Sequence, residues 1–339
     1  MSLKIKVINS HQKDEIFYIS ISENDRMIDI RKEIQKKSVY FSEMSYNRIG
    51  LFIFIPKDLL VDLEKEKNKS KKINSKKNFF NTIENSPEKM KLSNKNDFKI
   101  LESYPYIKNN YKKIILYSYD LGMQISTPLA NIIEYSAPIF ILIFYIIKYF
   151  YFDDNNKKLN KVQIWTIIMI IFHYTKRVFE SVFVHIQINT MEFKMFLIEC
   201  FYYILYFGIY AQKKIFTNVK DIDNCFNYCF ILLFFISEIN NYHCHIILRK
   251  IRLINSNSRE IPKGNIFNLV YCANYFWEIL SWVFISLFSS IKAIYYFTFM
   301  GSVVMTLWAL EKKEFYNKLL LKKYNIINNK KMAIIPFVI

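Results

Sequence analysis

Six long apolar segments between residues 128 and 310 constrain the fold of this 339-residue chain more than any other feature. An α-helix needs about 20 mostly apolar residues to cross the hydrocarbon core of a bilayer. The segments are close to that length, and they cover residues 128–152, 163–185, 195–211, 224–248, 265–286 and 288–310. The pattern predicts an α-helical polytopic membrane protein with about six transmembrane helices, with seven as the alternative count.

The first 127 residues have the composition of a water-soluble domain. Residues 4–8 alternate between polar and apolar side chains, and residues 16–21 are β-branched and aromatic, as is typical of strands. Residues 27–34 place apolar side chains on one face of a helix, and residues 50–55 and 113–118 predict two further strands. The order strand, strand, helix, strand, strand resembles a ubiquitin-like β-grasp domain, which we expect over residues 1–127.

A stretch rich in Lys, Asn, Ser and Glu interrupts this domain at about residues 63–99. Its apolar content is too low to offset the conformational entropy that folding would remove. We therefore expect a disordered insertion in a surface loop.

The formal net charge of +18 is distributed unevenly along the chain. With six spans, the loop 249–264 and the tail after residue 310 are rich in Lys and Arg, whereas the loops near 153–162 and 212–223 also carry Asp. Cytosolic loops of membrane proteins are enriched in Lys and Arg. The pattern predicts a cytosolic domain 1–127 and a membrane-embedded domain 128–339 with a cytosolic C-terminal tail. Both termini are then cytosolic, and the positive charge serves membrane lipid rather than nucleic acid.

Several classes of site are disfavoured by what the sequence lacks. No G-x-G-x-x-G or G-x-x-x-x-G-K-[ST] motif occurs, which argues against a Rossmann dinucleotide fold and a P-loop ATPase. The five His residues are too few for clustered histidine ligands, and the five Cys residues form no C-x-x-C motif. We therefore expect no metal site.

Ionisable and amide side chains occur inside the predicted spans, where they are costly and usually functional. They lie mostly toward the cytosolic ends of these spans: Glu134, His173, Lys176, Arg177, Glu180, His185, Glu238, Asn240, Asn241, His243, His245, Asn274 and Glu278. This one-sided distribution favours a water-accessible cavity that opens to the cytosol.

Helical spacing aligns part of this set. Asn241, His245, Arg249 and Arg252 are 4, 4 and 3 residues apart, so they form one stripe along a helix. Arg is the natural partner of phosphate, because its planar fork makes bidentate contacts. The stripe favours a site for a phosphorylated cofactor. The alternative interpretation is hydrogen bonding between helices, with long side chains reaching the interface at the helix ends.

Short blocks in a fixed order carry a resemblance that spans nearly the whole chain. They are D-L-G-M-Q at 120–124, E-Y-S-A-P at 134–138, H-Y-T-K-R-V-F-E at 173–180, the block 241–252, C-A-N-Y-F-W-E at 272–278 with S-W at 281–282, and W-A-L at 308–310 with Tyr316 and the ending I-P-F at 335–337. Together they resemble the trans-2-enoyl-CoA reductases of very-long-chain fatty acid elongation, in the steroid 5α-reductase superfamily. The chain differs from that family at 186–192, which is one residue shorter and lacks an Arg.

The resemblance implies NADPH-dependent reduction of a long-chain trans-2-enoyl-CoA, in the last step of the elongation cycle. It implies that Tyr275 is the proton donor and that Glu134, as the second catalytic residue, orients that phenol or polarises the substrate carbonyl. It also implies an endoplasmic reticulum membrane location and other elongation enzymes as partners. The NADPH contacts carried over are Asn241, His245, Arg249, Arg252, Asn274, Glu278 and Tyr316. Three further residues, Lys176, Arg177 and His185, are expected to bind substrate or phosphate.

Three other functions stay open at this point. The first is a sister activity, the reduction of a steroid or polyprenol enone. The second is a non-enzymatic membrane transporter or a ubiquitin-like scaffold, and the third is a membrane methyltransferase that uses S-adenosylmethionine.

Overall fold

The computed structural model describes residues 2–12, 14–54, 89–92, 101, 112, 114–151, 158–187, 189–217, 219, 221, 225–254, 260–324 and 331–335. The chain packs as two compact units. The first comprises residues 1–126, 188–193 and 318–327, and the second comprises residues 127–187, 194–317 and 328–339.

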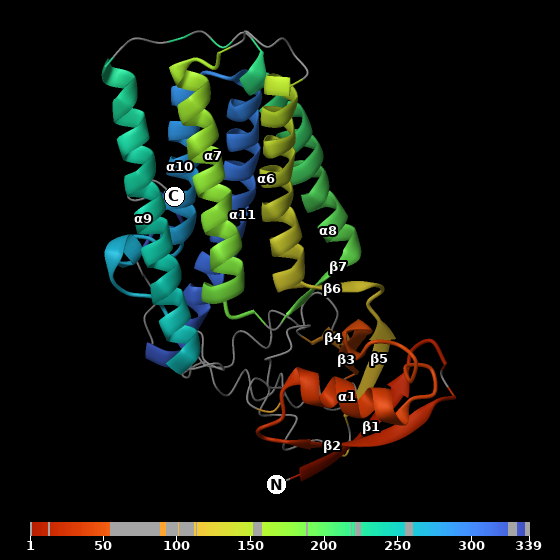
Figure 1. Ribbon diagram of the computed structural model, residues 1–339. Coiled ribbons are helices and arrows are strands. Elements are labelled where there is room, and N and C mark those ends of the chain that lie inside the picture. Colours follow the sequence, from red (N-terminus) through yellow and green to blue (C-terminus); the bar gives the residue numbers. More distant parts are fainter. Residues whose placement is uncertain are drawn as a thin grey trace. The chain divides into compact units, whose positions relative to one another are not determined.

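A mixed five-stranded sheet forms the body of the first unit (Figure 1). Its strands are β1 (Ser2–Asn9), β2 (Ile16–Ser22), β3 (Ile49–Phe54), β4 (Lys89–Lys91) and β5 (Ile115–Asp120), in the order β2-β1-β5-β3-β4. The central strands β1 and β5 are parallel, and the other pairs are antiparallel. Helix α1 (Met27–Lys37) supplies Met27, Ile30 and Ile34 to a core that also takes the inward side chains of β1, β2, β3 and β5.

The strands and the helix expected from the sequence are therefore present, and β4 is additional. A short 3-10 helix, η1 (Tyr46–Arg48), precedes β3. Of the stretch 63–99 that we expected to be disordered, only residues 89–92 are described, and three of them form β4. The rest of that stretch lies outside the described residues. A strand at this position was not visible in the sequence, because Lys89–Lys91 has neither the length nor the apolar alternation that signals one.

Asp120 organises the turn that follows β5. The Arg48 side chain donates to its carboxylate, with Nε 2.9 Å from Oδ1, and the Gly122 N–H donates to the same oxygen at 2.8 Å. Gly122 has φ of +79°, a conformation that glycine adopts without steric cost. The D-L-G block therefore has a structural role. It directs the chain into β6 (Gln124–Ser126), which pairs with β7 (Thr190–Glu192).

The ion pair at Asp120 predicts a pH dependence of the first unit. Hydrogen bonding from Arg48 holds the pKa of the Asp120 carboxyl below its usual range, although burial opposes this effect. A carboxyl whose pKa is lower when folded stabilises the fold above its unfolded pKa, and this contribution is lost as the pH falls through the folded pKa. We expect β5 to open more often as the pH falls below about 4, measured by hydrogen exchange in the whole chain. Asp120→Asn should open more at neutral pH and lose part of this dependence; an unchanged dependence would contradict the prediction.

Long helices that run alongside one another form the second unit (Figure 1). They are α6 (Thr127–Tyr151), α7 (Lys161–Phe179), α8 (Phe193–Cys200), α9 (Cys225–Ile254), α10 (Ala273–Ser289) and α11 (Lys292–Tyr324). Helix α7 continues into a π-helical turn, η3 (Glu180–Val184), and α8 into a π-helix, η4 (Phe201–Ala211), followed by a 3-10 turn, η5 (Lys214–Phe216). Another 3-10 turn, η6 (Asn265–Asn268), precedes α10.

Among the described residues, four helices are long and apolar enough to cross a membrane: Thr127–Tyr151, Phe193–Phe216, Asn227–Leu253 and Lys292–Asn317. The two other expected spans are helical but differ from the expectation. The segment 163–185 is interrupted by charged side chains and ends in the π-helical turn. The segment 265–286 begins with a 3-10 turn, so that the helix itself, α10, has 17 residues and starts at Ala273.

Local signals explain where these helices begin and bend. Asn160 caps α7 and exchanges hydrogen bonds with Gln163, which forms a capping box. Pro138 lies inside α6 and has no N–H, so the carbonyl of Glu134, four residues earlier, lacks its helical partner. An aromatic core that includes Tyr174, Phe207, Trp282 and Phe297 joins α7, η4, α10 and α11.

Candidate functional site

Helix α7 packs against α9 and α10, and the three enclose a polar network. The Lys176 ammonium lies 2.6 Å from Glu238 Oε2 and donates to Asn241 Oδ1 at 2.6 Å. One turn earlier, His173 has Nδ1 2.7 Å from Glu238 Oε1 and Nε2 3.4 Å from Glu278 Oε1. His173, Glu238 and Asn241 are buried, so these charges lie away from solvent.

Arg177 extends the network toward α6. Its Nη1 donates to Glu180 Oε2 at 3.0 Å, and its Nε lies 3.6 Å from Glu278 Oε1. Its Nη2 donates to the Tyr135 hydroxyl at 2.8 Å, and the guanidinium carbon lies 4.7 Å from the centre of the Tyr135 ring. The block E-Y-S-A-P thus supplies a phenol, Tyr135, that holds Arg177 through both a hydrogen bond and a cation–π contact.

Two histidines continue the network from Arg177. His245 Nε2 lies 3.4 Å from Arg177 Nη1, and His245 Nδ1 lies 3.2 Å from His185 Nε2. Since arginine only donates, His245 Nε2 accepts, and its proton is then on Nδ1 and is donated to His185. The proton of His185 is therefore assigned to Nδ1, which is buried and has no hydrogen-bond partner among the described residues.

Two arginines at the end of α9 bond the carbonyls where the α7–η3 helix ends. Arg249 donates to the carbonyls of Phe183 and Val184, the latter at 3.1 Å, and Arg252 donates to that of Ile186 at 2.7 Å. The last carbonyls of a helix have no partner within the helix, so these contacts are stabilising. The stripe expected on α9 therefore lies on one face, directed toward α7 and η3.

The charges inside the network are largely matched. Lys176 and Arg177 face three carboxylates, those of Glu180, Glu238 and Glu278, at distances between 2.6 and 3.6 Å. A buried cation that is already paired has little excess charge to offer an incoming phosphate. In this geometry Lys176 and Arg177 form the wall of a site more readily than a phosphate clamp.

Glu180, His185 and His245 place one potential metal ligand each within 4.8 Å of one another. Glu180 Oε2 and His245 Nε2 are 3.9 Å apart, and Arg177 Nη1 is bonded to both of them. A metal ion bound to these two atoms would have to displace the guanidinium. The chemistry of the three residues therefore fits an arginine contact better than a cation site.

Glu134 faces α8 rather than joining the network through a described hydrogen bond. It is buried on α6, and its carboxyl lies beside that of Glu199 on α8. Two neighbouring buried carboxyls favour a proton on one of them, because two negative charges at one site repel each other. Among the described residues, no hydrogen bond or ion pair joins Glu134 to Tyr275.

Tyr275 lies in the first turn of α10 and meets α11 instead. Lys312 Nζ donates to the Tyr275 hydroxyl at 2.7 Å and lies 4.3 Å from the centre of its ring. Trp308, one turn earlier on α11, has its ring centre 6.3 Å from that of Tyr275. Tyr316, one turn later, stacks on Tyr271, with ring centres 5.3 Å apart.

The chain near its C-terminus holds the start of α10 in place. The N–H groups of Tyr271 and Cys272 donate to the carbonyls of Met332 and Ala333 at 2.9 and 3.0 Å, and the Met332 N–H donates back to Leu269. Ala333 and Ile334 are buried in the same cluster as Tyr271 and Cys272. Tyr275 is thus positioned by a backbone pairing between segments about 60 residues apart.

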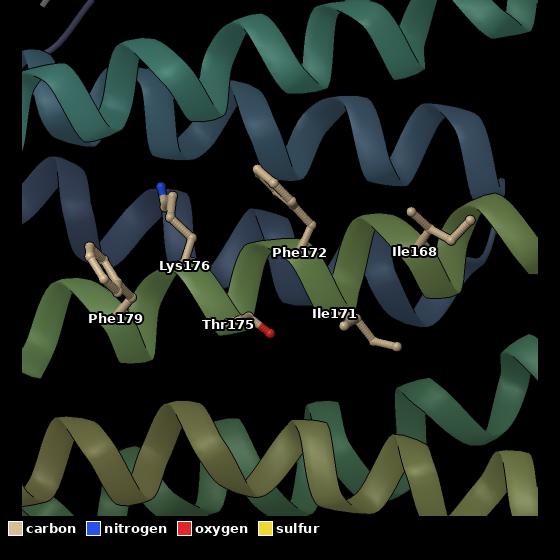
Figure 2. A pocket seen from close by; sticks show the side chains of 6 residues that line it. All are labelled: Ile168, Ile171, Phe172, Thr175, Lys176 and Phe179. Carbon is tan, nitrogen blue, oxygen red and sulfur yellow. The ribbon is translucent and has the colours of Figure 1, made fainter.

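A cavity of about 570 Å³ opens along α7 (Figure 2). Its lining residues follow one another at helical spacing: Ile168, Ile171, Phe172, Thr175, Lys176 and Phe179. Four of the six side chains are apolar. Because Lys176 belongs both to this lining and to the buried network, the cavity reaches the polar site from its apolar side.

The structure thus groups the expected site residues in three places. The network contains Lys176, Arg177, His185, Asn241, His245 and Glu278, and Arg249 and Arg252 lie at its end. Asn274 joins it through its carbonyl, which accepts from the Asn241 amide at 2.8 Å. Tyr275 and Tyr316 lie with Lys312, and Glu134 lies with Glu199. Sequence reasoning missed the contacts of Tyr135, Glu199, Glu238 and Lys312. Tyr135 belongs to the block E-Y-S-A-P and Glu238 is an intramembrane charge, so both carry a signal in the sequence. Lys312 belongs to the Lys-rich tail, which predicts only membrane topology.

Comparisons with known proteins identify chains that are similar to this one. A family described as 3-oxo-5-alpha-steroid 4-dehydrogenase matches residues 184–339. A Dictyostelium discoideum protein named very-long-chain enoyl-CoA reductase is 34% identical over 231 residues, which cover 66% of this chain and 74% of that protein. A Caenorhabditis elegans protein named probable very-long-chain enoyl-CoA reductase is 32% identical over 248 residues, covering 67% and 77%. A human protein named trans-2,3-enoyl-CoA reductase-like is 25% identical over 245 residues, covering 67% and 64%.

Proposed function

This chain belongs to the very-long-chain enoyl-CoA reductase family of the steroid 5α-reductase superfamily, and we propose that it reduces a long-chain trans-2-enoyl-CoA to the saturated acyl-CoA. The observation that carries the proposal is the placement of Tyr275. A phenol that can donate a proton is held by an ammonium group, in a cluster that joins the block at 272–278 to Ala309, Tyr316 and the segment near the C-terminus. In the elongation cycle this reaction is the last step.

The chemistry requires a proton donor beside the substrate. Reduction of the double bond leaves negative charge on the thioester oxygen and on C2, and a donor must stabilise that charge or deliver the proton. A phenol has an unperturbed pKa near 10, so it is protonated at neutral pH and can donate. We assign this role to Tyr275. Glu134, which can hold a proton against Glu199, is proposed as the second catalytic residue, acting on the carbonyl.

Members of this family are oxidoreductases, which implies a nicotinamide cofactor, and we assign NADPH. When bound, NADPH supplies the hydride that adds to C3. The residues present fit such a group: Arg249 and Arg252 bring two guanidinium groups to the end of α9. Arginine suits phosphate through its rigid fork of donors.

Four other residues that we expect to contact NADPH belong to the buried network. They are Asn241, His245, Asn274 and Glu278. Because Lys176, Arg177 and their contacts with one another hold these residues in place, they offer a rigid wall to the cofactor. His185, with its buried Nδ1 proton, is the member of this wall that we propose to contact substrate or phosphate. Lys176 and Arg177 would act mainly by holding that wall.

The acyl chain needs an apolar space that begins at the polar site. The cavity along α7 has this character (Figure 2), and Lys176 in its lining also belongs to the network. We propose that part of the acyl chain lies there and continues into membrane lipid. The CoA head would then remain on the polar side.

The proposed function also implies a membrane topology and a cellular location. We propose six membrane spans, with α7 and α10 crossing beside the four apolar helices, in the endoplasmic reticulum membrane with both termini in the cytosol. We also propose that the first unit is a ubiquitin-like domain. The strand order β2-β1-β5-β3-β4 with a single helix between β2 and β3 supports this, and the domain would serve contacts with other elongation enzymes.

The decisive experiment is a reductase assay on the purified chain in detergent. We expect NADPH to be consumed with trans-2-hexadecenoyl-CoA, with hexadecanoyl-CoA identified by mass spectrometry. A 4-ene-3-ketosteroid and a polyprenol enone serve as competing substrates. Reduction of either one in place of the enoyl-CoA would move the chain to the sister activity. If NADPH neither binds nor is consumed with any of them, the reductase proposal fails.

A further inference from the structure

Among the described residues, the Tyr275 hydroxyl has one hydrogen-bond partner, and that residue is one to which the sequence assigned no catalytic part. Lys312 on α11 donates to the phenol oxygen at 2.7 Å, and its ammonium also lies over the ring face at 4.3 Å. Its side chain is exposed, whereas the phenol is half-buried. The two groups therefore link the site to solvent through a single hydrogen bond.

We infer that Lys312 is a positioning residue for the reduction: it orients the Tyr275 hydroxyl, stabilises the phenolate that forms when this group gives up its proton, and returns a proton to it. The inference rests on the proposed function of Tyr275. It assigns to Lys312 the orienting role that the sequence had suggested for Glu134.

These proton transfers balance without an added reactant. The Tyr275 O–H bond breaks as the proton joins C2 of the substrate, which leaves a phenolate 2.7 Å from the ammonium. One Lys312 N–H bond then breaks and the phenol O–H bond forms again, which leaves a neutral amine. Lys312 lies near the C-terminal end of the span Lys292–Asn317, which we propose to face the cytosol, and water there restores its proton.

The contacts of Lys312 differ from those of a lysine that only forms ion pairs. Among the described residues, Lys312 forms no ion pair with a carboxylate, unlike Lys176, which faces Glu238 and Glu180. An ammonium that is not neutralised by a carboxylate keeps its full effect on a developing negative charge nearby. The Lys312 charge therefore acts on the phenol rather than on the stability of the fold.

The test compares Lys312→Met with the adjacent Lys313→Met, which removes the same charge one residue away. We expect Lys312→Met to lower kcat by about 10- to 100-fold, with the KM for the enoyl-CoA and the Kd for NADPH within about twofold of wild type. Lys313→Met should leave all three unchanged. Lys312→Arg, which keeps a cationic donor, should recover part of the lost kcat. A Lys312→Met variant that matches Lys313→Met, or that loses NADPH affinity while kcat at saturation is retained, would overturn the inference.

A double-variant cycle with Tyr275→Phe distinguishes a positioning effect from a general loss of structure. If Lys312 acts through the phenol, adding Lys312→Met to Tyr275→Phe should change kcat by less than about threefold, since the effects of residues that act as a unit are not additive. Full additivity would contradict the inference even if Lys312→Met folds poorly. An inactive wild-type protein would instead count against the proposed function.

Discussion

Tyr275→Phe is expected to lower kcat for enoyl-CoA reduction by about 10²- to 10⁴-fold, the usual contribution of a well-placed general acid. The substitution removes only the hydroxyl. The ring that packs near Trp308 and under the Lys312 ammonium remains, so the fold and the binding of NADPH should survive. Single-turnover reduction and a separate measurement of the Kd for NADPH distinguish the chemical step from binding.

A matched control for this variant is available on α11. Tyr296→Phe removes a hydroxyl from a side chain that is 65% exposed among the apolar residues of that helix. We expect wild-type kcat from it. Full activity in Tyr275→Phe would remove Tyr275 from the mechanism, and equal losses in the two variants would indicate a general sensitivity to tyrosine substitution.

Glu238→Ala is expected to reduce the free energy of unfolding by about 3–5 kcal/mol, the usual consequence of leaving a buried charge without its partner. Glu238 is 1% exposed and faces both His173 at 2.7 Å and the Lys176 ammonium at 2.6 Å. Its removal leaves Lys176 with Glu180 at 3.6 Å and with the Asn241 amide oxygen. Chemical unfolding in detergent, followed by tryptophan fluorescence, measures the change.

Two comparisons identify the cause of that loss. Glu311→Ala makes the same chemical change at an exposed position of α11 and should alter stability by less than about 0.5 kcal/mol. The double variant Lys176→Met with Glu238→Leu replaces the ion pair by apolar groups and should be more stable than Glu238→Ala. If the double variant is no more stable, an unpaired Lys176 is not the reason for the loss.

Much of the helical part could be predicted because its signals are local. Apolar runs of about 20 residues identify helices irrespective of their neighbours, and the stripe from Asn241 to Arg252 follows from helical periodicity alone. The two segments that depart from expectation, 163–185 and 265–286, are those in which charged side chains or a 3-10 turn interrupt the run. There the partners across helices decide the structure, and a single segment carries no information about them.

The residues proposed for a reductase site came from the family resemblance. The sequence by itself determined the two-part organisation and the positions of the main helices and strands. It did so because composition and periodicity act over neighbouring residues. Only the tertiary structure decided which charges meet across helices: Lys176 is paired with Glu238 and Arg177 with Glu278, whereas Lys312 reaches Tyr275. These three contacts join residues 62, 101 and 37 positions apart, and only packing brings them within a few ångströms. The contacts of Lys176 and Arg177 with Glu180, four and three residues away, follow from helical spacing instead.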